Sequence, residues 1–199
     1  TKTKKFEFYS ESLKAALEGH AEKHNTTVDN VLEVCNYLAR GEMAFVPHYE
    51  EAFIAGDEKE YTFIHVDYKS RLNREGRSAN CTWYHDFKDL DPGDVPWEDV
   101  AKINPRDAKP LGIKSGDTVK LTSPTGSLTC TASLWEGVRP GTIAKCYGQG
   151  HWAYGRLASK EFGKVPRGGS SNDLIPAQYD RLSGSTAFYA TTRIKIEKI

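Results

Sequence analysis

The first third of the chain has the apolar spacing of two short helices. Ser10 or Ser12 is a suitable N-cap for the first helix, which would end near Gly19. Thr27 is a suitable N-cap for the second helix, which would run to a stop at Gly41. Apolar residues recur three and four positions apart in both segments, as a helix with one buried face requires. These residues are Leu13, Ala16, Leu17, Val28, Val31, Leu32, Cys35, Leu38 and Ala39.

Alternation of apolar and polar residues, which is typical of strands, occupies most of the remaining chain. Residues 5–9 alternate over one short strand, and from Tyr61 onward aromatic and β-branched residues become frequent. The candidate strands there are 61–66, 118–122, 128–134, 142–146 and 186–196. Several short strands separated by Gly and Pro turns favour a small barrel or sandwich over a parallel α/β sheet. We therefore expect a helical lead-in and connector at residues 1–57, followed by a mainly β domain at 58–199.

One internal repeat refines the expected β fold. The segment 112–119 (GIKSGDTV) is echoed by 137–144 (GVRPGTIA), with glycines at matching positions before a strand. Glycine permits the positive φ that tight turns require. Two such turns leading into strands suggest a barrel of two interlocked halves with pseudo-twofold symmetry. Two ordinary hairpin turns that resemble each other by chance are the alternative.

Composition and charge exclude several classes of function. Lys+Arg and Asp+Glu balance at 27 each, so no global field favours nucleic acid or an anionic membrane. No apolar run approaches the roughly 20 residues of a membrane span. The start of the chain, TKTKK, has neither an initiator Met nor an apolar signal core behind it, as expected for a fragment or a processed chain.

The cysteines and histidines do not form recognisable metal motifs. Because no two of the four cysteines form a C-x-x-C pair, we expect four buried or half-buried structural thiols rather than an iron–sulfur or zinc site, and disulfides are the alternative. His20 and His24 have helical spacing but no third ligand nearby, and we expect both to be exposed. No nucleophile–base pattern, H-E-x-x-H, Walker loop or strand-following G-x-G-x-x-G is present.

The segment 103–113 (INPRDAKPLGI) has the strongest candidate chemistry. Asn104 starts a turn with the following proline, and Asp107 lies in a short helical stretch that closes at Gly112. A carboxylate held at a turn can accept two parallel N–H bonds from the edge of a guanine. The alternative is that Asp107 only caps its own helix.

Three other segments have the composition of ligand-binding loops. Residues 69–80 combine four basic side chains with Ser, Asn and Gly, as a diphosphate loop does. Residues 148–155 combine glycine with aromatic residues and a histidine, which suits stacking on a flat heterocycle. Residues 167–174 have the composition of a second, amide-lined anion loop. Solvated surface loops and plugs of a barrel end are the alternatives.

These residues together resemble a known family. The segment 103–113, followed by Ser115–Val119, is similar to the C-terminal dinucleotide-binding domain of the dimethyl-sulfoxide-reductase superfamily of molybdenum and tungsten oxidoreductases. The resemblance extends from Lys5 nearly to the end of the chain. It includes KFEFYS at 5–10, RSANC at 77–81, SNDLI at 171–175 and the C-terminal LSG and RIKIEK segments. Its lead-in and RSANC loop look closest to the thiosulfate, polysulfide, tetrathionate and arsenate reductases of anaerobic respiration.

The resemblance implies a double-psi β-barrel of the aspartate-decarboxylase-like type, which binds molybdopterin guanine dinucleotide. Asp107 would then bind guanine, and Asn104 would shape its turn. The residues expected to line the pterin and diphosphate are Ser70, Arg71, Arg77, Ser78 and Asn80. Those expected on the pterin side are His151, Trp152, Tyr154 and Asn172.

The same resemblance places catalysis outside this chain. The metal ligand and any iron–sulfur cluster would belong to earlier domains, so no catalytic or metal-binding residue is expected here. The expected partners are those preceding domains and an iron–sulfur electron-transfer subunit, without nucleic acid or membrane insertion. Residues upstream of Thr1 would set the compartment, periplasmic or cytoplasmic. Two alternatives stay open: a free-standing double-psi barrel that serves as a binding or assembly module, and a self-cleaving pyruvoyl decarboxylase.

Overall fold

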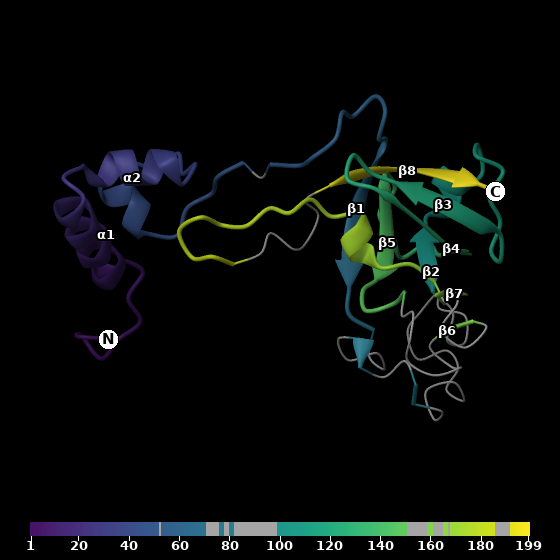
Figure 1. Cartoon of the computed structure of the whole chain (residues 1–199), viewed down its shortest axis with the longest axis horizontal. Helices are drawn as coiled ribbons and strands as arrows, with labels where there is room; N and C mark the ends of the chain where they lie inside the picture. Colours follow the sequence, from purple (N-terminus) through teal and green to yellow (C-terminus); the bar gives the residue numbers. More distant parts are fainter. Residues whose placement is uncertain are drawn as a thin grey trace. The chain divides into compact units, whose positions relative to one another are not determined.

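The structure is a computed structural model of the 199-residue chain. It describes residues 1–51, 53–70, 76–77, 80–81, 99–150, 159–160, 165–166, 168–185 and 192–199. The chain divides into two compact units (Figure 1). Unit 1 comprises Thr1–Ala52 and Gln178–Ala187, and unit 2 comprises Phe53–Ala177 and Phe188–Ile199.

Unit 1 is built from two helices and a 3-10 turn. Helix α1 spans Glu11–Lys23, α2 spans Val28–Val34, and the 3-10 helix η1 spans Gly41–Phe45. Ser10 and Thr27 cap the two helices, each accepting a backbone N–H three residues later, so both predicted caps are confirmed. Leu17, Leu32 and Phe45 form its buried core.

Three predictions for unit 1 are wrong. Residues 5–9 do not form a strand, because Glu7 folds back to accept the N–H of Thr3. Helix α1 continues through Gly19 to Lys23, since one interior glycine costs only about 1 kcal/mol and burial of Ala21 favours the last turn. Helix α2 ends at Val34 because Asn36 adopts a left-handed conformation (φ 63°) that closes it.

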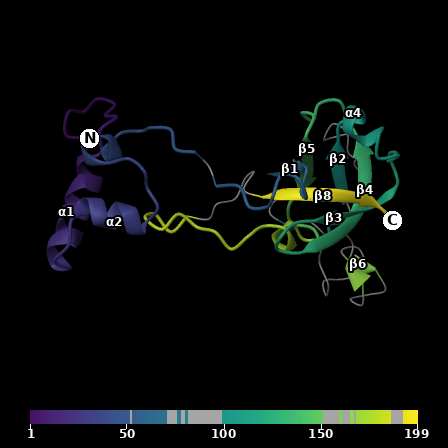
Figure 2. The ribbon, with the colours of Figure 1, turned by 90° about the horizontal axis from the view of Figure 1, so that it is seen from above.

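Unit 2 is a closed barrel of six strands (Figure 2). The strands are β1 Phe63–Tyr68, β2 Val100–Ile103, β3 Thr118–Thr122, β4 Ser127–Leu134, β5 Thr142–Cys146 and β8 Arg193–Lys198. Their order around the barrel is β1-β5-β2-β4-β3-β8. The pairs β1/β5 and β2/β4 are parallel and the others are antiparallel, which gives the two parallel crossovers of a double-psi barrel and confirms the predicted fold.

The remaining elements of unit 2 connect these strands. Helix α4 spans Pro105–Ala108, and the 3-10 helix η3 spans Ser171–Asp173. Strands β6 (Ser159–Lys160) and β7 (Val165–Pro166) form a separate antiparallel pair. Inward-facing Val119, Leu121, Ile143 and Ile194 are among the residues that fill the barrel.

Most of the predicted strands are present, but one was missed. Strands β3 and β5 match their predicted ranges, β1 is shifted by two residues, and β8 is described as a strand only from Arg193. Strand β2 was not predicted because it is four residues long and buried at every position, which removes the alternation that marks a strand. Of the repeated glycines, Gly112, Gly116 and Gly141 have positive φ, whereas Gly137 does not.

Candidate functional site

The segment with the strongest predicted chemistry fastens two turns together. Asn104 caps α4 by accepting the N–H of Arg106 at 2.9 Å, and its Nδ2 donates to the carbonyl of Val138 at 2.7 Å. Asp107 Oδ2 accepts the N–H of Gly141 at 2.8 Å. Asp107 is therefore not the cap of its own helix. Its carboxylate holds the second of the two glycine turns against α4.

The candidate residues in the segment after β1 lie at the other end of the strands from Asp107. Gly141 precedes β5, whereas Tyr147 follows β5 and donates its N–H to the carbonyl of Tyr68 at the end of β1. Gly141 and Tyr147 are six residues apart along the extended strand, which corresponds to about 20 Å. Ser70 therefore lies near the end of the barrel opposite Asp107. The structure does not bring these two residues together, so the expectation that one loop cluster contains both is not met.

We call the barrel end that follows β1 and β5 the loop end. Ser70 is half-buried, and Arg77 and Asn80 in the segment after β1 are exposed. Asn172 is exposed on η3. The other predicted contacts, Arg71, Ser78, His151, Trp152 and Tyr154, lie outside the described residues.

The donors of the loop end fit an anionic dinucleotide. Guanidinium, hydroxyl and amide groups are the usual phosphate ligands, and Arg77, Ser70 and Asn80 supply one of each. Gly148 and Gly150, directly after β5, both have positive φ (83° and 82°), a conformation in which successive backbone N–H groups can line an anion site. The residues present thus suit the diphosphate of such a ligand.

Buried charges lie at the loop end and were not predicted from the sequence. Lys145 is fully buried on β5, and its Nζ lies 2.8 Å from Oδ1 of Asp99, which is also buried. On β1, Nε2 of buried His65 lies 3.3 Å from Oδ1 of buried Asp67. The alternation of inward and outward residues along β5 could have predicted the burial of Lys145, because Lys145 lies on the same inward face as Ile143.

The cysteines are free thiols, and burial makes one of them inert. Cys130 and Cys146 are buried and Cys35 is half-buried, but Cys81 is exposed, contrary to the prediction. Burial, with a smaller contribution from Asp99, raises the pKa of Cys130 to about 12. Among the residues that the structure describes, no group of His, Cys, Asp or Glu is placed to hold a metal ion. None of the described helices is long and apolar enough to span a membrane.

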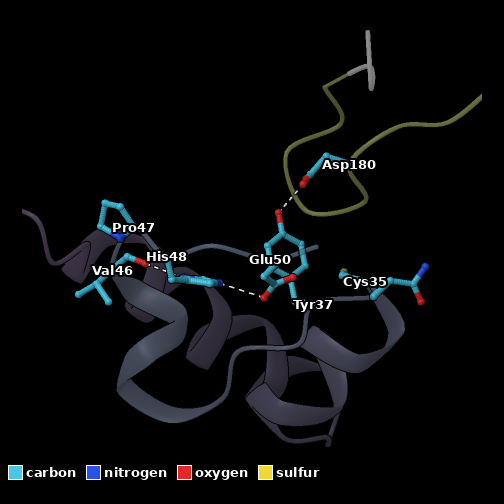
Figure 3. Close-up of a pocket in the computed structure, with 8 residues that line it drawn as sticks. Cys35, Tyr37, Val46, Pro47, His48, Glu50 and Asp180 are labelled. Carbon is cyan, nitrogen blue, oxygen red and sulfur yellow. Dashed lines mark hydrogen bonds and ion pairs between the residues drawn. The ribbon is translucent and has the colours of Figure 1, made fainter. Parts of the chain in front are cut away.

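Unit 1 has a polar surface cavity of about 430 Å³ (Figure 3). Tyr37 donates its hydroxyl to Asp180, which lies 143 residues later in the chain. Burial, together with Asp180, raises the pKa of Tyr37 to about 12. Nε2 of His48 bonds Oε1 of Glu50 at 2.9 Å. These polar groups bond one another and form a hydrogen-bonded network in the cavity wall.

The His48–Glu50 pair has shifted protonation equilibria. The carbonyl of Val46, followed by Glu50, raises the pKa of His48. The backbone N–H of Ala39 makes the largest contribution to lowering the pKa of Glu50, with further contributions from His48 and the N–H of Leu38. The pair therefore braces residues 38–39 most strongly when the imidazole is protonated and the carboxylate is ionised.

Comparison with known proteins identifies the family. The model of the molydopterin dinucleotide binding domain matches residues 73–192, more than half of the chain. The chain belongs to this family. The family binds molybdopterin dinucleotide, so the predicted family, fold and type of cofactor are confirmed. The match covers β2 to β7 and η3, whereas β1 and β8 lie outside the matched range.

Two curated relatives align over the whole chain, and a third aligns over about half of it. ArrA, the molybdopterin-containing subunit of arsenate respiratory reductase, from Shewanella sp. (strain ANA-3) is 61% identical over 199 residues, 100% of this chain and 23% of the relative. ArrA from Chrysiogenes arsenatis is 63% identical over 200 residues, 100% of this chain and 24% of the relative. A tetrathionate reductase subunit from Archaeoglobus fulgidus is 41% identical over 96 residues, 48% of this chain and 8% of the relative. The chain spans about a quarter of the length of the ArrA relatives.

A solved structure shares the fold. Acetylene hydratase from Pelobacter acetylenicus superposes with a TM-score of 0.56 at 20% identity, covering 85% of this chain and 22% of that one. At this level of identity the likeness concerns only the fold. It agrees with the closed barrel described above.

Proposed function

We propose that this chain holds a guanine dinucleotide form of molybdopterin within the catalytic subunit of an arsenate-reducing enzyme. The identity of more than 60% to two arsenate respiratory reductase subunits, over the whole chain, carries this proposal. The tetrathionate reductase relative is less similar and aligns with only half of the chain. When bound in the complete enzyme, the cofactor supplies the metal-centred, two-electron chemistry.

The residues of this chain would bind and orient the dinucleotide. Arg77, Ser70 and Asn80 would neutralise and hydrogen-bond the diphosphate from the segment after β1. Asn172 would approach the pterin from η3. We assign Asp107 to the turn between the two halves of the barrel, because its Oδ2 already accepts the N–H of Gly141.

The full-length enzyme provides the test. Acid hydrolysis should release GMP, elemental analysis should find molybdenum or tungsten, and the enzyme should oxidise a reduced viologen dye with arsenate as acceptor. Reduction of tetrathionate but not arsenate would refute the assigned substrate. Release of no nucleotide would refute cofactor binding and favour a binding or assembly module.

Two arginine variants test the assigned barrel end. Arg77→Ala should lower the pterin content, because removing a charge-assisted phosphate contact costs about 1.5–3 kcal/mol. Arg139→Ala is the matched control, because Arg139 is also exposed but lies in the turn before β5 that contains Gly141. Equal loss of pterin in both variants would contradict the assignment of phosphate contacts to the loop end.

A further inference from the structure

A fully buried lysine at the loop end is not explained by cofactor contact. Lys145 has 0% exposure and points inward on β5, where the cost of removing an ammonium from water is several kcal/mol. Three oxygens surround its Nζ: Asp99 Oδ1 at 2.8 Å, the Gly169 carbonyl at 2.8 Å and the Cys146 carbonyl at 3.2 Å. These contacts compensate the charge within the barrel.

The Lys145–Asp99 ion pair binds both the N–H and the carbonyl of Gly169, and we call this arrangement the clamp. Lys145 donates to the carbonyl of Gly169, and Asp99 Oδ2 accepts the N–H of the same glycine at 2.7 Å. Hydrogen bonds to charged partners are roughly twice as strong as neutral ones. Gly169 is thus held from both sides by charges that are themselves fixed in the barrel wall.

The backbone at Gly168 and Gly169 packs too closely against Asp99 and Leu128 to leave space for a side chain. A Cβ on Gly168 would lie 2.3 Å from the Asp99 side chain, and Gly168 has a φ of +72°. A Cβ on Gly169 would lie 2.5 Å from Cβ of Leu128. Such distances do not occur between real side chains, so only glycine allows the backbone to sit this close to the clamp.

The clamped glycines lead directly into η3, which carries Asn172. Ser171 is buried, whereas Asn172 is exposed. The far side of η3 is also anchored, because Ser123 Oγ donates to the carbonyl of Leu174 at 2.8 Å. Two anchors on either side of a three-residue turn leave Asn172 projecting from a fixed backbone.

We propose that the Lys145–Asp99 ion pair is a positioning device, which holds residues 168–173 in the geometry that presents Asn172 to the dinucleotide. This inference rests on the proposed function. A buried ion pair is often no more stabilising than well-packed apolar residues. An apolar pair could not hold the N–H and carbonyl of Gly169 together, so its value here is the fixed course of the backbone. Lys145 and Asp99 act through the segment, without touching the ligand.

The test uses the full-length enzyme and two readouts, hydrogen exchange of residues 168–173 and pterin content. Lys145→Met should lower protection of this segment by roughly 10- to 100-fold, the loss expected for one hydrogen bond to a charged group. Its pterin content should fall by a similar factor during dialysis. Lys198→Met is the matched control, because it breaks the exposed ion pair between Lys198 and Asp117 (2.8 Å) in the same barrel. It should change neither readout.

A second variant keeps the test decisive if Lys145→Met fails to fold. Gly168→Ala leaves both charges paired but displaces the segment from Asp99, so it should give the same two losses. Asn172→Ala should lower pterin retention while protection of the segment stays at the wild-type level. Retained pterin in Gly168→Ala, despite lost protection, would overturn the positioning role while leaving cofactor binding intact. Unchanged protection in Lys145→Met or Gly168→Ala would overturn the clamp itself.

The failure of the proposed function has a different signature. If the wild-type enzyme contains no pterin dinucleotide, the proposed function fails, and with it the role of the clamp in retention. The hydrogen-exchange comparison between Lys145→Met and Lys198→Met would still decide whether the ion pair fixes the segment.

Discussion

Replacement of Asp107 separates two roles that a carboxylate at a turn could have. In the structure, Oδ2 of Asp107 accepts the N–H of Gly141 at 2.8 Å and thereby joins the turn at α4 to the turn before β5. A carboxylate that binds guanine would matter only when the dinucleotide is bound. A carboxylate that fastens the barrel would matter equally without it. The cofactor-free protein therefore distinguishes the two roles.

The expected magnitude follows from this one bond. A hydrogen bond to a charged group contributes about 1.5–3 kcal/mol, and Asp107 is half-buried, so Asp107→Ala should destabilise the barrel by about 1.5–3 kcal/mol. Asp107→Asn keeps an acceptor but loses the charge, and it should cost roughly half as much. For a folding unit of roughly 150–250 residues, about 1 kcal/mol corresponds to roughly 2–4 °C in the Tm of its own unfolding transition.

Thermal unfolding of the cofactor-free full-length protein, followed by circular dichroism, provides the measurement. Glu197→Ala, which removes an exposed carboxylate from β8 of the same barrel, is the control and should leave Tm unchanged. A wild-type Tm for cofactor-free Asp107→Ala, combined with loss of pterin from the loaded protein, would refute the fastening role. It would restore Asp107 as a contact of the ligand.

Three further predictions concern the second anchor of that turn and unit 1. Asn104→Ala should cost about 2–4 kcal/mol in chemical denaturation, because it removes a helix cap and leaves the buried Val138 carbonyl unpaired; a cost below about 1 kcal/mol would contradict this. Leu32→Ala should destabilise unit 1 by about 2–5 kcal/mol, seen as faster proteolysis there, since Leu32 is 1% exposed; unchanged cleavage would argue against this core. The raised pKa of His48 favours the brace at low pH, until Glu50, with its lowered pKa, becomes protonated. The brace contributes fully above the unfolded pKa of Glu50 and below that of His48, between about pH 4.3 and 6.5, and it is lost beyond the folded values. Exchange protection of the two amides bound by Glu50 should peak there, and His48→Gln should remove the decline on the alkaline side; a pH-independent profile would contradict the brace.

Local sequence signals determined the parts of this protein that depend on neighbours along the chain. Ser10 and Thr27 were identifiable as caps because capping is satisfied within three residues. The strands β3 and β5 were identifiable because flanking turns and β-branched residues lie beside them. The family was recognisable from the ordered segments 103–113 and 115–119, which lie next to each other in the chain.

Tertiary structure alone decided which of these residues meet. Nothing local shows that Asp107 reaches Gly141, 34 residues later, or that Lys145 is buried against Asp99 and Gly169. Parallel crossovers place the ends of distant strands together, so the direction of each strand determines which loops share an end. For this reason the sequence led to the correct family and barrel, but it assigned one ligand cluster to segments that lie at opposite ends of the strands.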